Sequence, residues 1–388
     1  MQVHASAPGR VAERAPWLIA AVTGRALAAS AARGGHRVVV LDYFADRDCA
    51  HHSVECRAVS ASGALCFDRA SLLASAASLA PASESPGLVY GSGFESRTGL
   101  LRELARGRRL WGNRPEVIRL VKDPKRFFPL LERLGIRYPE TRLTPPPRPS
   151  GWLVKQTGGA GGTGVRWAEG SRHRAGLYYQ RFERGRNLSA LFLANGERAS
   201  VLGFNRQWAR EVRPGLPFQF GGAVGGIRLA RRVKTEIAAA LDRLVSATGL
   251  AGLNGLDFIL ADGRWTVLEV NPRPTATAEL YDPEYSRGLF DWHLRACAGE
   301  LPGRIPAPRA ARAIAVIPAV EPWESSEDFT FPGWCRDLPR PGLPFTPGDP
   351  VCTVHAATRD PRSALQLLRR RSARLQELLS QATSVATA

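Results

Sequence analysis

The chain has 388 residues, of which 44% are hydrophobic and 23% charged, as in ordinary globular proteins, with room for two to four structural units. No apolar run approaches the roughly 20 residues that span a bilayer, so we expect no membrane partner. The apolar run at 17–22 is too short for the core of a signal peptide and is better explained as a first strand. We therefore expect a cytoplasmic protein.

The net charge of +18 would suit a nucleic-acid-binding protein, but the placement of the basic residues argues against one. Only four of the 53 basic residues are lysine, and apart from Arg369–Arg371 the arginines are scattered along the chain. A nucleic-acid-binding protein would concentrate its cations on one face or interleave them with stacking aromatics. We expect no nucleic-acid partner, because small anionic substrates suit the charge equally well.

The first predicted domain, residues 15–113, has a Rossmann-like pattern. Its predicted elements are a strand at 17–22, a helix ending at Arg33, and then strands at 37–42 and 88–90 and a helix at 99–106. A dinucleotide-binding loop would need Gly-x-Gly-x-x-Gly after the first strand, where Gly24 stands alone. The pattern therefore predicts the shape of a nucleotide-binding unit without its phosphate loop.

Three further regions are predicted at 114–185, 186–300 and 301–388. Their predicted elements are a helix at 116–134 interrupted at Asp123-Pro124, strands at 152–155 and 177–182, a hairpin of 188–193 and 199–204, a helix at 233–248, a hairpin of 255–260 and 265–270, strands at 313–317 and 351–355, and a helix from Pro361. The last region is rich in proline and predicted to be mainly β.

Two carboxylates and an amide lie on the second predicted hairpin, Asp257 on its first strand and Glu269 and Asn271 on its second. Residues two apart on a strand share a face, so the three side chains can converge. Carboxylate and amide oxygens suit Mg²⁺ (or Mn²⁺), with phosphates and water completing the octahedron. The pattern predicts a metal site, beside which Arg273 can direct its planar fork of donors at a phosphate oxygen.

A glycine-rich segment, 158–164, follows the strand that ends at Lys155. A lysine at a strand end can neutralise phosphates while backbone N–H groups of a mobile loop close over them. The segment lacks the Gly-Lys-Ser/Thr of a Walker A loop. Three of the four lysines, Lys122, Lys125 and Lys155, lie where phosphate ligands are expected.

In their order along the chain, these motifs resemble the ATP-grasp superfamily over roughly residues 15–300. The resemblance implies an α/β and α+β ATP-grasp fold with a Rossmann-like pre-ATP-grasp domain, a nucleotide clamp of two subdomains and a small β-rich C-terminal domain. It also implies an ADP-forming carboxylate–amine ligase, which uses ATP and Mg²⁺ to activate a carboxylate as an acyl phosphate and join it to an amine.

The resemblance also implies roles for particular residues. Lys155 and either Lys122 or Lys125 would hold the α- and β-phosphates, and spacing does not decide between the latter two. The other implied nucleotide contacts are the loop glycines Gly161 and Gly162 and the hinge residues Gln180, Arg181, Phe182 and Glu183. Many members hold the ribose with an acid at the position of Asn187, and here an amide must hydrogen-bond the hydroxyls instead. Arg273 would assist phosphoryl transfer.

The substrates are expected to be a small carboxylate and a small amine. Segments 91–95, 122–124 and 347–355 are similar to those of ATP-grasp proteins related to the tyramine–glutamate ligase of methanofuran and methylofuran biosynthesis, which implies glutamate and tyramine. Arg206 and segment 219–222 are candidate substrate contacts. The aromatics Trp208, Phe218 and Phe220 could stack an arylamine ring, or simply pack the central subdomain.

Two other functions stay open: a nucleotide-dependent oxidoreductase built on the N-terminal unit, and an ATP-binding protein without catalysis. The single glycine after the first strand disfavours the former, and the intact metal triad disfavours the latter. Cys49, His51, His52 and Cys56 are potential zinc ligands, but a structural zinc site usually pairs two short clusters and the sequence offers one. No motif defines the oligomeric state, and a homodimer is compatible with the sequence.

Overall fold

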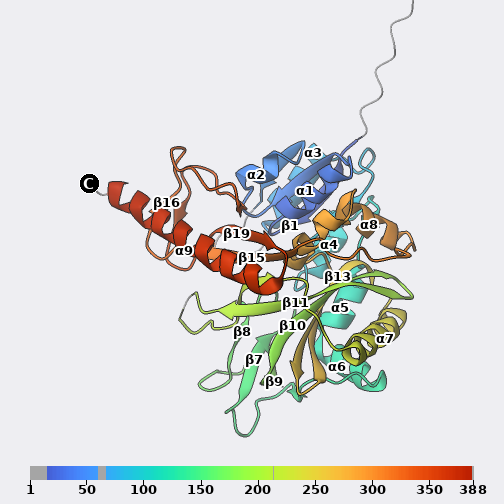
Figure 1. The fold of residues 1–388 in the computed structure, drawn as a ribbon. Helices are drawn as coiled ribbons and strands as arrows, with labels where there is room; N and C mark the ends of the chain where they lie inside the picture. Colours follow the sequence, from blue (N-terminus) through green and yellow to red (C-terminus); the bar gives the residue numbers. More distant parts are fainter. Residues whose placement is uncertain (1–14, 60–66, 213, 387–388) are drawn as a thin grey trace, which may run out of the picture.

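The computed structural model describes residues 15–59, 67–212 and 214–386 (Figure 1). The N-terminal elements, drawn in blue, lie at the top of the view, and the sheet that contains β7 and β9 lies at the bottom. The strands β10, β11 and β13 run between these two regions. None of the helices in the described residues is long and apolar enough to cross a membrane.

The N-terminal region is a five-stranded parallel sheet with helices. The strand order is β3-β2-β1-β4-β5. Its elements are β1 (Trp17–Ala21), α1 (Arg25–Arg33), β2 (Val38–Asp42), α2 (Arg47–Ala50), β3 (Glu55–Ala58), α3 (Arg69–Leu79), β4 (Leu88–Tyr90), α4 (Thr98–Leu104) and β5 (Leu110–Trp111). The chain reverses its direction of winding between β1 and β4, and ligands bind α/β sheets at the carboxyl ends of strands at such a point. The segments that follow β1 and β4 are therefore placed to line a site.

The second region joins two helices to a small antiparallel sheet of order β6-β9-β7-β8. Its elements are α5 (Pro115–Lys122), α6 (Pro124–Arg133), β6 (Thr141–Arg142), β7 (Trp152–Gln156), β8 (Val165–Trp167) and β9 (Leu177–Arg181). Asp123 ends α5 and caps α6, because its carboxylate accepts a hydrogen bond from the backbone N–H of Lys125 and Pro124 begins the new helix.

An eight-stranded sheet of order β14-β13-β10-β11-β12-β15-β19-β17 forms the rest of the core. Its first part contains β10 (Arg186–Asn195), β11 (Ala199–Arg210), β12 (Gln219–Val224), α7 (Arg231–Thr248), β13 (Ala251–Ala261), β14 (Arg264–Asn271), the 3₁₀ turns η1 (Ala276–Leu280) and η2 (Asp282–Glu284), and α8 (Gly288–Cys297). Alternate residues of β10 enter two different cores. Ala190 and Phe192 pack with Ile237 of α7, whereas Leu191 and Leu193 pack with Leu289 of α8.

The C-terminal elements extend the same sheet, because β12 pairs with β15. They are β15 (Ala311–Pro318), β16 (Trp323–Glu324), β17 (Cys335–Arg336), β18 (Pro344–Phe345), β19 (Pro350–Thr358) and α9 (Pro361–Ala386). Strands β16 and β18 form a separate ribbon. Leu368 and Leu375 of α9 pack in one core with Ala313 of β15 and Val354 of β19.

Most long elements agree with the sequence-based predictions, but eight strands and the helices α2, α3 and α8 were not predicted. The hairpin of β13 and β14 turns at Asp262-Gly263, both with positive φ (49° and 71°), as the turn sequence predicts. The unpredicted strands are β3, β5, β6, β8, β12, β16, β17 and β18. Segment 219–222, a candidate substrate contact, belongs to β12, where Gly222 (φ 155°) and its neighbour Gly221 weaken the strand signal.

Candidate active site

One cleft of about 1570 Å³ is lined by residues from all these regions. The sequence-predicted residues that line it are Lys155, Gly161, Gly162, Gln180, Arg181, Phe182, Glu183, Asn187, Asp257, Glu269, Asn271 and Arg273. Segment 219–221, Trp208 and Phe218 also line it, whereas Arg206 is an exposed residue of β11 outside that lining. The fold therefore brings the separate motifs to one cavity.

The predicted metal triad converges on the hairpin of β13 and β14. Asp257 and Glu269 are paired across the two strands, next to a β-bulge. Asn271 donates from Nδ2 to Asp257 Oδ2 at 2.9 Å, and Gln207 of β11 donates from Nε2 to Asp257 Oδ1 at 2.9 Å. Sequence reasoning missed Gln207, because its strand neighbours β13 only through β10.

Neighbouring charges give the two carboxylates different pKa values. Desolvation, followed by the charge of Glu269, raises the pKa of Asp257 to about 6. Burial acts in the same direction on Glu269, but the charges of Lys122, Lys155 and Arg273 outweigh it, so the pKa of Glu269 is lowered. Two facing, half-buried carboxylates and an adjacent amide fit a divalent cation, because added positive charge would relieve the repulsion between the carboxylates.

Lys122 and Lys155 both lie at this hairpin, and Lys125 does not. Lys122, the last residue of α5, donates from Nζ to Glu269 Oε2 at 2.8 Å with a side chain only 5% exposed. Lys155 of β7 donates from Nζ to Gln180 Oε1 at 2.8 Å. Burial, with the charge of Lys122, lowers the pKa of Lys155. Lys125 is exposed in the first turn of α6, so the geometry favours Lys122 of the two alternatives.

The glycine-rich segment touches two other parts of the cleft wall. The N–H of Phe220 donates to the carbonyl of Gly161 at 3.0 Å. A Cβ on Gly162 would overlap the carbonyl oxygen of Phe218, and a Cβ on Gly158 would lie 2.8 Å from Cα of Ser96. Close backbone approach thus requires glycine at 158 and 162.

The predicted hinge connects β9 to β10. Gln180 is buried and accepts a hydrogen bond from Lys155, whereas Phe182 is 37% exposed and lies tilted against Trp167 and Phe218, with ring centroids 5.1 and 6.4 Å away. Asn187 lies on β10 beside Ile259 of β13. The backbone and aromatic groups at this end of the cleft suit a flat heterocycle with a sugar beyond it.

Arg273 has a partner that sequence reasoning did not assign. Its Nε donates to Glu95 Oε1 at 2.5 Å, and both side chains are at most 10% exposed. The other carboxylate oxygen of Glu95 accepts from the N–H groups of Gly93 and Phe94. Burial alone would raise the pKa of Glu95, but Arg273 and Lys122 lower it. Glu95 therefore ties the segment after β4 to the end of β14.

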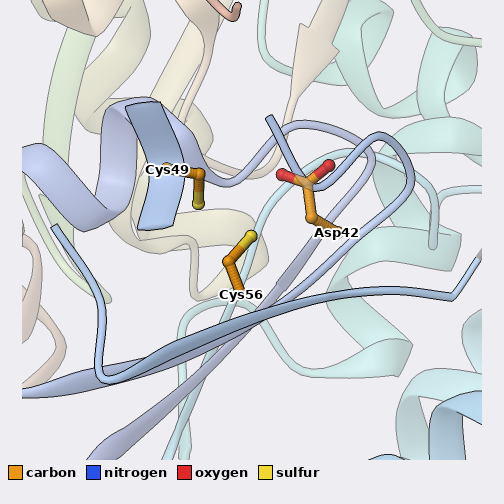
Figure 2. A group of neighbouring side chains, drawn as sticks. All are labelled: Asp42, Cys49 and Cys56. Atoms are coloured by element: carbon orange, nitrogen blue, oxygen red, sulfur yellow. The ribbon is translucent and has the colours of Figure 1, made fainter. Parts of the chain in front are cut away.

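The cysteine–histidine segment forms a different cluster from the one considered in the sequence. Cys49 of α2 and Cys56 of β3 gather with Asp42 at the end of β2, their ligand atoms within 4.8 Å of one another (Figure 2). His51 and His52 are exposed and are not part of that group. Both oxygens of Asp42 already accept backbone hydrogen bonds, from Gly24, Phe44 and Ala45. A role in shaping these loops accounts for Asp42 without a metal.

Comparison with known proteins agrees with this geometry. Residues 122–277 match the ATP-grasp domain family. The chain is similar in structure to biotin carboxylase from Campylobacter jejuni (TM-score 0.70, 13% identity, covering 90% of this chain and 89% of that one). It is also similar to L-amino acid ligase from Bacillus licheniformis (TM-score 0.68, 15% identity, covering 92% of this chain and 97% of that one). A third similar structure is N5-carboxyaminoimidazole ribonucleotide synthetase from Thermotoga maritima (TM-score 0.65, 17% identity, covering 94% of this chain and 98% of that one). No protein of curated function matches the sequence.

The chain therefore contains an ATP-grasp domain and has the ATP-grasp fold, with a Rossmann-like region before it and strands of a C-terminal region after it. This confirms the predicted fold class. The domain boundaries at 113, 185 and 300 stay predictions.

Proposed function

We propose that the protein is an ADP-forming carboxylate–amine ligase. The observation that carries this proposal is the convergence of Lys155, Asp257, Glu269 and Asn271 in the lining of a single cleft, with Lys122 ion-paired to Glu269. Such a set can neutralise the phosphates of ATP and stabilise charge that shifts during phosphoryl transfer. Biotin carboxylase, one of the similar structures, was solved as a β,γ-ATP complex, which supports a nucleotide in this cleft.

In this proposal the chain mainly positions and shields the reactants. Lys155 and Lys122 bind phosphate oxygens, the hinge 180–183 contacts adenine and Asn187 the ribose. Asp257, Glu269 and Asn271 would hold Mg²⁺ or Mn²⁺, which when bound neutralises phosphate charge. Arg273 presents the guanidinium held by Glu95 to the transferring phosphoryl group, and the segment 158–164 excludes water from the acyl phosphate.

Glutamate and tyramine are the substrates that we propose within this class. The aromatics Trp208, Phe218 and Phe220 all line the cleft, which supports an arylamine. Trp208 and Phe220 also pack against hydrophobic cores, so each ring also contributes to the packing of the fold. A cytoplasmic location and a homodimer stay predictions.

The test is ADP release with pools of carboxylates and amines, starting with glutamate plus tyramine, together with the mass of the product. We expect ADP and an amide in equal amounts. ATP binding without turnover for any pair would favour the non-catalytic binding protein. Binding of NADH with none of ATP would favour the oxidoreductase. Turnover with a different acid–amine pair would keep the ligase and discard these substrates.

A further inference from the structure

Away from the metal triad, the cleft contains a cluster of charges centred on a buried arginine. Arg25, the first residue of α1, is 5% exposed. It makes ion pairs with Glu279 of η1, with Asp337 after β17 at 3.0 Å and with Asp48 of α2 at 3.7 Å. We call Arg25, Asp48, Glu279 and Asp337 the Arg25 cluster. Arg25, Glu279 and Asp337 line the cleft.

The Arg25 cluster has too little positive charge for its carboxylates. Three carboxylates contact one guanidinium, which leaves an excess of two negative charges in a protein whose net charge is +18. The nearby Arg336 is exposed and donates to the carbonyls of Gly333 and Cys335. The composition of the chain would favour an excess of positive charge, so the excess of negative charge is a specific feature of the Arg25 cluster.

Two further polar groups beside the Arg25 cluster lack hydrogen-bond partners. Asp46 is 5% exposed, and its Oδ2 has none among the described residues. Burial, followed by the charge of Asp337, raises the pKa of Asp46 to about 9. Nε2 of His355 lies 3.4 Å from Glu279 Oε2 but makes no hydrogen bond within the described part of the chain. Buried polar groups normally have partners. Of these two residues His355 lines the cleft and Asp46 does not, so Nε2 of His355 is the atom that points to a missing ligand.

A continuous stretch of cleft wall links the Arg25 cluster to the metal triad. Residues 273–280 all line the cleft, from Arg273 beside Glu95 to Glu279 beside Arg25. Trp334 lines it too, and the guanidinium of Arg371 lies 5.5 Å from its ring. A ligand at the Arg25 cluster would therefore meet acceptor oxygens, with an aromatic ring in the same cleft wall.

We propose that the Arg25 cluster binds the amine substrate as its ammonium cation, with Glu279 and Asp337 as the acceptors. The proposal rests on the ligase function and names the subsite of its second substrate. A divalent metal ion fits less well, because the guanidinium of Arg25 lies inside the Arg25 cluster and would repel two charges. An anionic substrate would meet the carboxylates of Glu279 and Asp337. An ammonium group adds one positive charge and can donate to the carboxylates of these two residues, which line the cleft.

The test is calorimetric titration of the full-length protein with tyramine and with 4-ethylphenol, which lacks only the amino group, and with ethanolamine and putrescine as further ammonium probes. We expect at least one ammonium probe to bind, and tyramine to bind at least about tenfold more tightly than 4-ethylphenol if the ring is accepted. Glu279→Gln should weaken amine binding by about tenfold or more, and Asp337→Asn should do the same. The matched control is Asp291→Asn, a partly buried, ion-paired carboxylate outside the cleft lining, which should change nothing.

The proposal is wrong if no ammonium probe binds, or if both cluster variants bind amines as the wild type does while ATP binding shows them to be folded. If Glu279→Gln fails to fold, Asp337→Asn and the tyramine comparison in the wild-type protein decide. Amine binding without ADP release from any acid–amine pair would contradict the ligase function and support the amine subsite. ADP release with an amine whose KM is the same in the wild type and in both variants would support the ligase function and contradict the amine subsite.

Discussion

At the hairpin of β13 and β14, Lys122 and Lys155 lie against Asp257 and Glu269, and positive and negative groups balance. At the Arg25 cluster, three carboxylates share one guanidinium. The first set comes mainly from the ATP-grasp domain, residues 122–277, and most of its members stand in recognisable motifs. The second comes from α1, α2, η1 and the segment after β17, which are far apart in the chain.

Because the two groups of charged residues differ in their charge balance, substitutions in them should affect different properties of the protein. Changes at the hairpin should affect every reaction that uses ATP, because the phosphate and metal contacts are common to all of them. Changes at the Arg25 cluster should affect only the amine.

Glu269→Gln should lower ATP turnover by about a thousandfold or more, because it removes a charged metal-facing oxygen from the hairpin. The variant should still fold, because the amide oxygen of glutamine can accept the hydrogen bond from Lys122, but its thermal unfolding temperature should fall because the buried ammonium group loses its charged partner. ADP release in saturating Mg²⁺ measures the effect. Turnover close to wild type would remove the metal site from the proposal.

Gly162→Ala should lower turnover by about a hundredfold, because the new methyl group would overlap the carbonyl of Phe218 and keep the loop from closing. Gly161→Ala is the matched control. Both glycines have positive φ (63° and 73°), so the backbone strain is similar, but position 161 has no described atom within 4 Å of the new Cβ. Equal losses in the two variants would mean that strain, and not closure, is responsible.

Lys155→Ala should weaken ATP binding by about 10- to 100-fold, because a charge-assisted contact to phosphate is lost. Lys125→Ala and Lys234→Ala should bind ATP normally, since both side chains are exposed on helices. Titration calorimetry with ATP gives all three constants. If Lys125→Ala matched Lys155→Ala, our choice of Lys122 over Lys125 would be overturned.

The smallest effect at neutral pH is expected at His293 of α8, outside both charge clusters. Its Nδ1 accepts from the N–H of Leu253, and its Nε2 donates to the carbonyl of Trp111. Burial lowers its pKa from 6.5 to about 4. Between these values the unfolded chain binds the extra proton, so stability is present above about pH 6.5 and is lost as the pH falls toward 4.

On going from pH 7.5 to pH 4.5, the wild type should therefore lose about 2 to 3 kcal/mol more free energy of unfolding than His293→Gln. Denaturant titrations of both proteins at the two pH values measure this difference. An equal loss in the two proteins would show that other groups control the acid sensitivity. ATP and amine affinities at neutral pH should be almost unchanged in the variant.

How far the site could be predicted depended on the range of each interaction. Asp257, Glu269 and Asn271 converge because alternation along a strand and a two-residue turn are local rules. Lys122 could not be chosen over Lys125 from spacing, because the choice depends on where α5 ends against β14. Glu95 and Gln207 were missed as partners, since each reaches its contact from a different strand or region.

The sequence by itself determined most of the long helices and strands, the hairpin that carries Asp257, Glu269 and Asn271, and the glycine-rich segment. These follow from periodicity and turn residues, which act over a few residues at a time, and the order of the motifs along the chain resembled the ATP-grasp superfamily. Only the tertiary structure decided the short strands β3, β5, β6, β8, β12, β16, β17 and β18, the helices α2, α3 and α8, the pairing of Arg273 with Glu95 and the Arg25 cluster. The ion-paired residues lie far apart in the chain, because 312 residues separate Arg25 from Asp337 and 178 separate Glu95 from Arg273. Burial and ion pairing at such separations depend on how the sheets pack, which local patterns do not encode.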